Sequence, residues 1–285
     1  MVLIGAHTFA WSPGITDAEL ERLMPRLTGT AVDYVELASY DLVDLTPASV
    51  RRLSETHGLP VTICSGLPKG LDLSSADPSV RRQAQDHVRR LLDFSHACGA
   101  LKLSGPIHGD LSVPASAPTS VDQRQRLIDS YLNLRPELEQ AALPFSIEPL
   151  NRYQSSLLNT LEQVAEVCDA INLPNVGILA DLFHANIEQG NIYNDLASHQ
   201  NHTTHVHLCG ANRGPIGQCH LDWNRITDWL LAFPAKMMVS IETFDSSNPV
   251  VAQRTRTWRQ LGLDSQIIVL EGARTLKQMM GVLPP

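Results

Sequence analysis

The sequence has no run of lysine or arginine, and its acidic residues outnumber its basic ones. Its 285 residues include 22 Lys and Arg against 30 Asp and Glu, which gives a formal charge of −8. Because a nucleic-acid backbone is a polyanion, an acidic chain without a basic cluster is a poor candidate for binding it. We therefore expect no nucleic-acid partner.

The sequence also lacks long apolar runs, a secretory leader and paired cysteines. No stretch approaches the ~20 apolar residues that span a bilayer. The apolar segment Val2–Ala10 has no basic start and meets Trp-Ser-Pro-Gly at once, so it predicts a strand and not a signal peptide. The five cysteines are dispersed, without a C-x-x-C pair, which argues against a disulfide scaffold or a cysteine-based zinc site. These absences predict a cytoplasmic protein with no membrane partner.

Nucleotide-binding glycine motifs are missing too. No G-x-G-x-x-G follows the first predicted strand, and G-x-x-x-x-G-K-[ST] does not occur, which disfavours a doubly wound sheet. Apolar or β-branched runs instead alternate with amphipathic helical stretches. The predicted strands are Val2–Phe9, Asp33–Ala38, Pro60–Ser65, Ala100–Gly105, Pro144–Leu150, Val176–Leu182, His202–Leu208 and Lys236–Thr243. Eight βα repeats predict a single (β/α)8 TIM barrel, with residues 1–285 as one domain.

Residues that typically begin and end helices support this alternation. Predicted helices include Asp17–Leu27, Pro47–His57, Ser79–Cys98, Gln123–Ala142 and Leu161–Ile171. Thr46 precedes one helix as an N-cap, either Asn159 or Thr160 precedes another, and Gly58 and Gly99 end helices. We expect the tail 263–285 to cover the outside of the barrel or to contact another subunit, in a dimer or tetramer.

Four consecutive predicted strands end in a metal-ligating side chain. They end in Glu148, Asp181, His207 and Glu242, each about one βα repeat after the last. Residues at the carboxyl ends of barrel strands meet at the active-site mouth, so three carboxylates would converge there and repel one another. A divalent cation is the simplest compensation. The oxygen-rich set predicts one Mn²⁺ per chain, with Mg²⁺, Co²⁺ or Zn²⁺ as alternatives.

The same strand ends carry a family resemblance. The chain resembles the ketose 3-epimerases (D-tagatose and D-psicose 3-epimerases) of the xylose-isomerase-like barrels. The likeness covers nearly the whole chain and is strongest from 145 to 245. The matching segments are Ile147–Tyr153, Leu158–Thr160, Asp181–Glu188, His205–Leu208, Ala211–Arg213 and Ile241–Phe244.

The resemblance implies a sugar epimerase that works through an enediolate stabilised by the metal. Glu148 and Glu242 would be metal ligands and also the two acid/base catalysts, with Asp181 and His207 completing the metal site. His184 and Arg213 would bind substrate oxygens. A base on one face of the carbon and an acid on the other is what inversion requires, and a bound cation stabilises the negative charge that develops.

Other candidate positions rank lower, and some depart from the family pattern. Possible substrate contacts are Trp11, Cys64, Gly105, Gln154 and Phe244. Gln154 stands where the family has an acidic residue, Ile15 where it has an aromatic one, and Gly210 where it has an acidic one. Because of these departures, the sequence does not predict which sugar is the substrate. Glu36 could be a further carboxylate at the mouth, His7 is predicted to be a core histidine, and His108 and His220 lie in loops.

Two alternative functions remain at this stage. An aldose–ketose isomerase or a dehydratase could use the same metal site, because one enediolate can be reprotonated elsewhere or lose a β-hydroxyl. A metallohydrolase like the AP endonucleases shares the barrel. That enzyme would want more histidine ligands and a basic DNA-binding face, and the charge of −8 argues against it.

Overall fold

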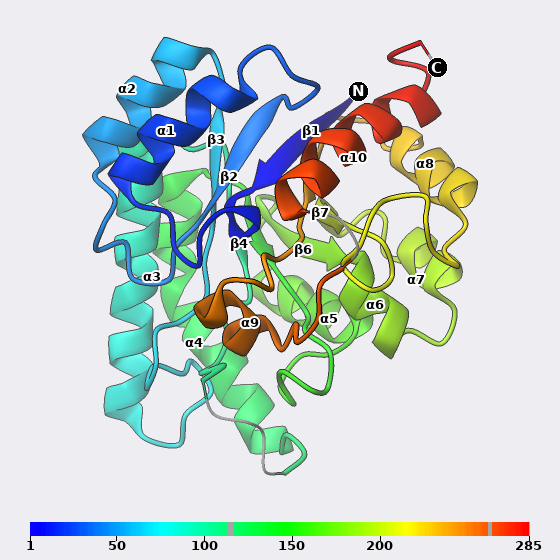
Figure 1. Ribbon diagram of the computed structural model, residues 1–285. Helices are drawn as coiled ribbons and strands as arrows, with labels where there is room; N and C mark the ends of the chain where they lie inside the picture. The colour runs from blue at the N-terminus through cyan, green and yellow to red at the C-terminus, as the bar shows by residue number, and fades with distance from the viewer. Residues whose placement is uncertain (113–116, 262–263, 285) are drawn as a thin grey trace.

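The computed structural model describes residues 1–112, 117–261 and 264–284. Eight parallel strands close into a barrel, and each strand pairs with its neighbours in chain order (Figure 1). The strands are β1 (Val2–His7), β2 (Tyr34–Ala38), β3 (Val61–Cys64), β4 (Leu103–Gly105), β5 (Phe145–Ile147), β6 (Val176–Asp181), β7 (Thr203–Leu208) and β8 (Met237–Ile241). The predicted single (β/α)8 barrel is confirmed.

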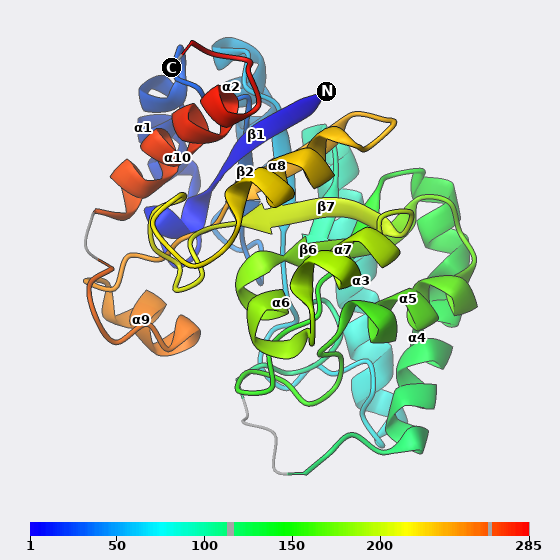
Figure 2. The same ribbon diagram turned by 90° about the vertical axis from the view of Figure 1, so that its right-hand side faces the viewer.

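Helices surround the barrel and connect its strands. A 3₁₀ turn, η1 (Thr8–Ala10), follows β1. The helices are α1 (Asp17–Leu27), α2 (Pro47–His57), α3 (Pro78–Cys98), α4 (Val121–Ala141), α5 (Leu161–Ile171), α6 (Leu182–Glu188), α7 (Ile192–Ser198), α8 (Trp223–Leu231), α9 (Pro249–Thr255) and α10 (Ser265–Met279). Figure 2 shows α6, α7 and α8 on the side that faces the viewer, with β7 between α8 above and α7 below. None of the described helices has the length and apolar character that crossing a bilayer requires.

Local sequence signals fix the helix ends. The Thr46 hydroxyl accepts from Ser49 N–H at the start of α2, and Thr160 forms a capping box at the start of α5. Gly58 and Gly99 end α2 and α3 in the left-handed conformation that glycine adopts without steric cost. The predicted caps at these positions are confirmed.

The interior of the barrel is polar. Glu36 on β2 accepts hydrogen bonds from His207 on β7 and Ser104 on β4, although these strands are not neighbours. Tyr34 on β2 likewise bonds Ser240 on β8, at 2.7 Å. Contacts between non-adjacent strands must cross the lumen, so these side chains fill it in place of the branched apolar residues usual in such barrels.

The layer between strands and helices is apolar. Val35 and Leu37 alternate with the inward residues of β2 and are fully buried in the main hydrophobic cluster. The C-terminal helix α10 closes this layer over β1 and β8, so the tail, within the described residues 264–284, covers the barrel as expected. Leu263 and Pro285, the ends of the predicted tail, lie outside the described residues.

Candidate metal and proton-transfer site

Four buried side chains converge at the carboxyl ends of the last four strands. Glu148 follows β5, Asp181 ends β6, His207 lies near the end of β7, and Glu242 follows β8. Their ligand atoms all lie within 4.8 Å of one another. His207 Nδ1 is 3.3 Å from Glu242 Oε2, 3.8 Å from Asp181 Oδ2 and 4.0 Å from Glu148 Oε1. The barrel therefore brings together the four residues singled out from strand ends.

The His207 ring is oriented by Glu36, which the sequence predicts only as a further carboxylate at the mouth. Its Nε2 lies 2.9 Å from Glu36 Oε2, and both side chains are fully buried. A carboxylate beside Nε2 favours a proton there, which leaves Nδ1 to face the cluster. Within the described structure Nδ1 is buried and has no hydrogen-bond partner. Glu36 also bonds His205 and Ser104, and the two histidines hold the pKa of its carboxyl well below the usual range despite its burial.

The two carboxylate oxygens of Asp181 have different roles, one as a helix cap and one within the cluster. Oδ1 accepts from the N–H groups of Phe183 and His184 and caps α6. Oδ2 faces His207 and lies 2.6 Å from Arg213 Nη1. The helix cap thus fixes which oxygen points into the cluster.

Arg213 is a fully buried cation within the cluster. The same Nη1 lies 2.8 Å from Glu242 Oε2, and the guanidinium carbon stands 4.5 and 4.8 Å from the ring centres of Phe183 and Phe244. Part of the charge compensation that the sequence analysis assigned to a metal therefore comes from Arg213. One guanidinium carries a single positive charge, whereas the cluster contains three carboxylates. A divalent cation could balance the negative charge that remains.

The two glutamates have contrasting electrostatic surroundings. Burial raises the pKa of Glu148 well above its usual range, with opposition from His207. Burial also works against the ionised form of Glu242, but Arg213 and two histidines outweigh it and hold its pKa well below the usual range. A bound divalent cation would favour the ionised form of both.

The donor set fits a metal ion. Three carboxylates and an imidazole suit Mn²⁺ or Mg²⁺, and bonds of about 2.0–2.6 Å from one centre would reach four atoms spaced as these are. The unpaired, buried Nδ1 of His207 is the observation that supports this most directly, since a metal would satisfy it.

Comparison with known proteins identifies the family of this chain. The family model of the xylose isomerase-like TIM barrels matches residues 28–261. The chain belongs to the xylose isomerase-like TIM barrel family. A probable ketose 3-epimerase of Synechocystis is 28% identical, over 97% of this chain and 96% of that protein. The 3-dehydro-D-guloside 4-epimerase of Escherichia coli is 31% identical, over 64% of this chain and 71% of that one. A solved L-ribulose 3-epimerase superposes with a TM-score of 0.90 at 25% identity, over 99% of this chain and 95% of that one.

Three of the remaining candidates of this xylose isomerase-like barrel lie beside the cluster. His184 Nε2 is 3.7 Å from Glu148 Oε1. Phe244 stacks on Arg213 and contacts Phe9, whose ring centre is 5.9 Å away. Cys64 has its sulfur within 4.8 Å of nitrogens of His7 and His207, and burial raises the pKa of its thiol well above the usual range.

The other predicted contacts have structural explanations or are not members of the cluster. Gly105 has φ +122°, and a Cβ there would approach Ser65 O to 2.2 Å, so backbone packing accounts for this glycine without any need for ligand space. Trp11 is half-buried against the core, and Ile15 is buried within it. Gln154 is half-buried in the loop after β5 and donates its backbone N–H to Asn151 O.

The loop that carries Arg213 explains one departure from the family pattern. A Cβ on Gly210 would lie 2.8 Å from Pro215 O and 3.0 Å from Gly214 O. An acidic side chain at this position would therefore require the loop to move.

Three histidines of lower rank occupy different surroundings. His7 is fully buried, as expected of a core residue, but its Nε2 lies 3.7 Å from Glu242 Oε1, so it belongs to the site. His108 is buried and bonds the Glu148 carbonyl, at 3.1 Å. His220 pairs with Asn186 at the surface.

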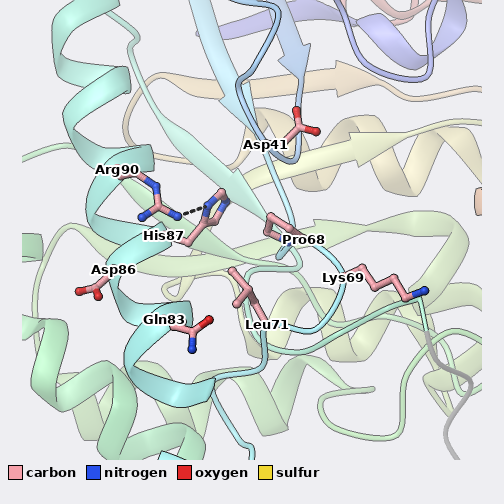
Figure 3. Close-up of a pocket in the computed structure, with 8 residues that line it drawn as sticks. All are labelled: Asp41, Pro68, Lys69, Leu71, Gln83, Asp86, His87 and Arg90. Carbon is pink, nitrogen blue, oxygen red and sulfur yellow. Dashed lines mark hydrogen bonds between the residues drawn. The ribbon is translucent and has the colours of Figure 1, made fainter. Parts of the chain in front are cut away.

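A separate groove lies on the outside of the barrel, beside α3 (Figure 3). It has a volume of about 450 Å³, and its lining is Asp41, Pro68, Lys69, Leu71, Gln83, Asp86, His87 and Arg90. The only hydrogen bond drawn there joins His87 and Arg90, and the lining includes no member of the strand-end cluster. This groove is therefore separate from the candidate metal site at the barrel mouth.

Proposed function

We propose that this chain is a metal-dependent sugar epimerase that inverts the carbon next to the ketone of a ketose, with C3 favoured. The relatives named as ketose and L-ribulose 3-epimerases support the reaction class. The observation that carries the proposal is that Glu148 and Glu242 share one buried cluster although they come from β5 and β8, which are not neighbours.

In this proposal the two glutamates move the proton. One carboxylate removes the proton of the substrate carbon from one face, and the other delivers a proton to the opposite face. Deprotonation next to a ketone gives an enediolate, whose charge needs stabilisation. His184 lies 3.7 Å from Glu148 and Arg213 lies 2.8 Å from Glu242, so both would bind substrate oxygens beside the glutamates.

We propose one Mn²⁺ per chain, held by Glu148, Asp181, His207 and Glu242. When bound, the cation supplies stabilisation of negative charge on the substrate oxygens. Elemental analysis of protein purified without chelator tests this part, with Asp181→Asn as the variant. Asn retains the Oδ1 that caps α6 and loses the charge, so the fold should survive while the bound metal falls. Unchanged metal content in the variant contradicts the assignment.

The substrate is identified by proton exchange. The wild-type protein, loaded with Mn²⁺, is incubated in D₂O with a panel of ketoses, aldoses and keto-glycosides, and the recovered sugars are read by NMR after the metal is removed. We expect deuterium at the carbon next to the ketone together with the epimer. Exchange at C1 and C2 of an aldose–ketose pair would instead support the isomerase alternative, and loss of water the dehydratase.

A second position of reaction is favoured by one relative. The 4-epimerase of Escherichia coli acts, by its name, on a 3-dehydro sugar, so its reacting carbon also adjoins a ketone. Keto-glycosides therefore belong in the panel, and deuterium at C4 would assign this chain to that reaction.

We also propose a cellular compartment, a domain organisation and an oligomeric state for the enzyme. We place it in the reducing cytoplasm, since all five cysteines are free thiols. We further propose that residues 1–285 act as one domain and assemble as a dimer or tetramer, which sedimentation velocity tests.

A further inference from the structure

Two histidines stand beside the two glutamates in matching positions. His184 Nε2 is 3.7 Å from Glu148 Oε1, and His7 Nε2 is 3.7 Å from Glu242 Oε1. Both imidazoles are almost completely buried. They come from separate parts of the barrel, since His184 lies on α6 and His7 ends β1. Each carboxylate thus has its own imidazole.

The protonation of His184 follows from its neighbours. Its Nδ1 lies 3.1 Å from the backbone N–H of Asn151 and 2.8 Å from the side-chain amide of Asn151. The amide oxygen accepts from Tyr153 N–H, so the amide nitrogen is the atom that faces His184. Two donors on Nδ1 require a lone pair there, which places the only proton on Nε2.

Arg213 does not change this assignment. Its Nη2 lies 3.3 Å from His184 Nε2, and a guanidinium can only donate. A neutral imidazole has a single acceptor nitrogen, and Nδ1 already serves two donors. The contact with Arg213 is therefore an approach of two donors, and the adjacent cation further disfavours a second proton on the ring.

His7 shows the same pattern. Its Nδ1 accepts from the backbone N–H of Phe9, at 3.3 Å, because this histidine caps the η1 turn. Its proton therefore lies on Nε2, which is buried and has no hydrogen-bond partner among the described residues. The distance of 3.7 Å to Glu242 is too long for a hydrogen bond. A buried donor without a partner at the edge of the site is available to a bound ligand.

We propose that His7, like His184, is a neutral Nε2–H donor that faces the substrate, and that each donor serves the side of the reacting carbon that its glutamate faces. Neither imidazole is a base, since the lone pair of each is taken by a backbone N–H. The inference rests on the proposed epimerase function for the identity of the substrate, whereas the protonation pattern does not depend on it.

The protonation pattern is tested by NMR of the full chain with ¹⁵N-labelled histidine and Mg²⁺. The spectra of His7→Phe and His184→Phe assign the two rings by loss of their signals. We expect pyridine-like Nδ1 and pyrrole-like Nε2 in both. A pyrrole-like Nδ1 in His7 overturns the proposal, whatever reaction the enzyme catalyses.

The role of the His7 donor is tested by a matched pair of variants. The amide nitrogen of Gln reaches about as far as Nε2 of histidine, and that of Asn only about as far as Nδ1. We expect His7→Phe to lower kcat/KM about 10- to 100-fold, as for loss of a hydrogen bond to a group that gains charge. His7→Gln should recover most of this and His7→Asn little, with bound metal unchanged in all three. His87→Phe, at a buried histidine on α3 outside the site, controls for the loss of a buried ring.

The outcomes separate the two proposals. Equal activity of the Gln and Asn variants, or a His7→Phe variant within twofold of wild type, contradicts the role of His7. A wild-type protein that exchanges no proton of any keto sugar contradicts the epimerase function, and the NMR result then still decides the protonation of His7.

Discussion

The two halves of the barrel contribute to the site in different ways. The second half, β5 to β8, supplies the four candidate metal ligands directly from its strand ends. The first half, β1 to β4, supplies groups that reach across the lumen. Glu36 on β2 contacts His207 on β7, and Lys102 beside β4 donates to the Thr204 carbonyl on β7. The second half therefore presents the candidate metal ligands, whereas the first half orients them and adds His7 at the edge of the site.

The largest effect should come from the two glutamates of the second half. Glu148→Gln and Glu242→Gln preserve shape and one weak oxygen ligand, but neither amide can accept a proton from carbon. We expect each variant, once loaded with metal, to lose ~10²–10⁴ of kcat. A variant that lacks one base should still wash deuterium into one epimer without forming the other.

Single-turnover measurements at matched metal content distinguish these losses from metal loss. Near wild-type interconversion by both metal-loaded variants would show that the two-carboxylate mechanism is wrong. The protonation inferred for the histidines excludes them as substitutes, so another base would have to be found.

Sequence reasoning captured the second half well, for a physical reason. Each of Glu148, Asp181, His207 and Glu242 follows an apolar strand at βα spacing, so local pattern alone places them at one mouth. Asp181 additionally caps α6, which ties its position to the backbone. The barrel itself followed from the same alternation.

The roles of residues in the first half are harder to predict, because they depend on partners that are distant in sequence. Glu36 was noted as a strand-end carboxylate, but its contact with His207 spans 171 positions and has no local signal. His7 was assigned to the core, and its burial is indeed complete. What sequence could not show is that its outer nitrogen faces Glu242. The sequence also predicts Gly105 as a substrate contact, although the close backbone of Ser65 explains the glycine there.

A second prediction concerns Lys102 and the stability of the polar lumen. Burial lowers the pKa of Lys102 to about 8 from its ordinary 10.5, with Glu36 opposing the shift. The folded state therefore loses this proton at lower pH than the unfolded state does. The cost of burying the charge is complete below pH 8 and is relieved as the pH rises from about 8 to 10.5.

The free energy of unfolding of wild type, relative to Lys102→Met, should accordingly rise over that interval by about 3 kcal/mol. Denaturant titrations at several pH values measure it, and the variant removes the contribution of all other titrating groups. A difference that stays flat with pH would show that Lys102 keeps its proton through hydration or a stronger pairing with Glu36.

The third prediction tests the orienting role of the first half. Glu36→Gln should weaken metal binding about 10- to 100-fold, because His207 loses the carboxylate that holds its proton on Nε2. Ser104→Ala removes another hydrogen bond to the same carboxylate and should act far less. Titration calorimetry with Mn²⁺ compares the two. Equal weakening by both variants would point to a general loosening of the lumen rather than to the orientation of His207.

The smallest effect is expected at Gln154, which lies in the loop after β5 and outside the cluster. The family resemblance puts an acidic residue there, and a charged partner for a sugar hydroxyl in a dry site is worth ~1.5–3 kcal/mol. Because Gln154 is half-buried, water screens that charge, and we expect Gln154→Glu to raise kcat/KM for D-psicose or D-tagatose about tenfold at most. Gln154→Ala controls for loss of the amide. A gain confined to the Glu variant would show that this loop selects the substrate while the strand-end cluster performs the reaction. Equal activity of all three proteins on these ketohexoses would place the selection elsewhere, and the loop that carries Gly210 and Arg213 would be the next segment to vary.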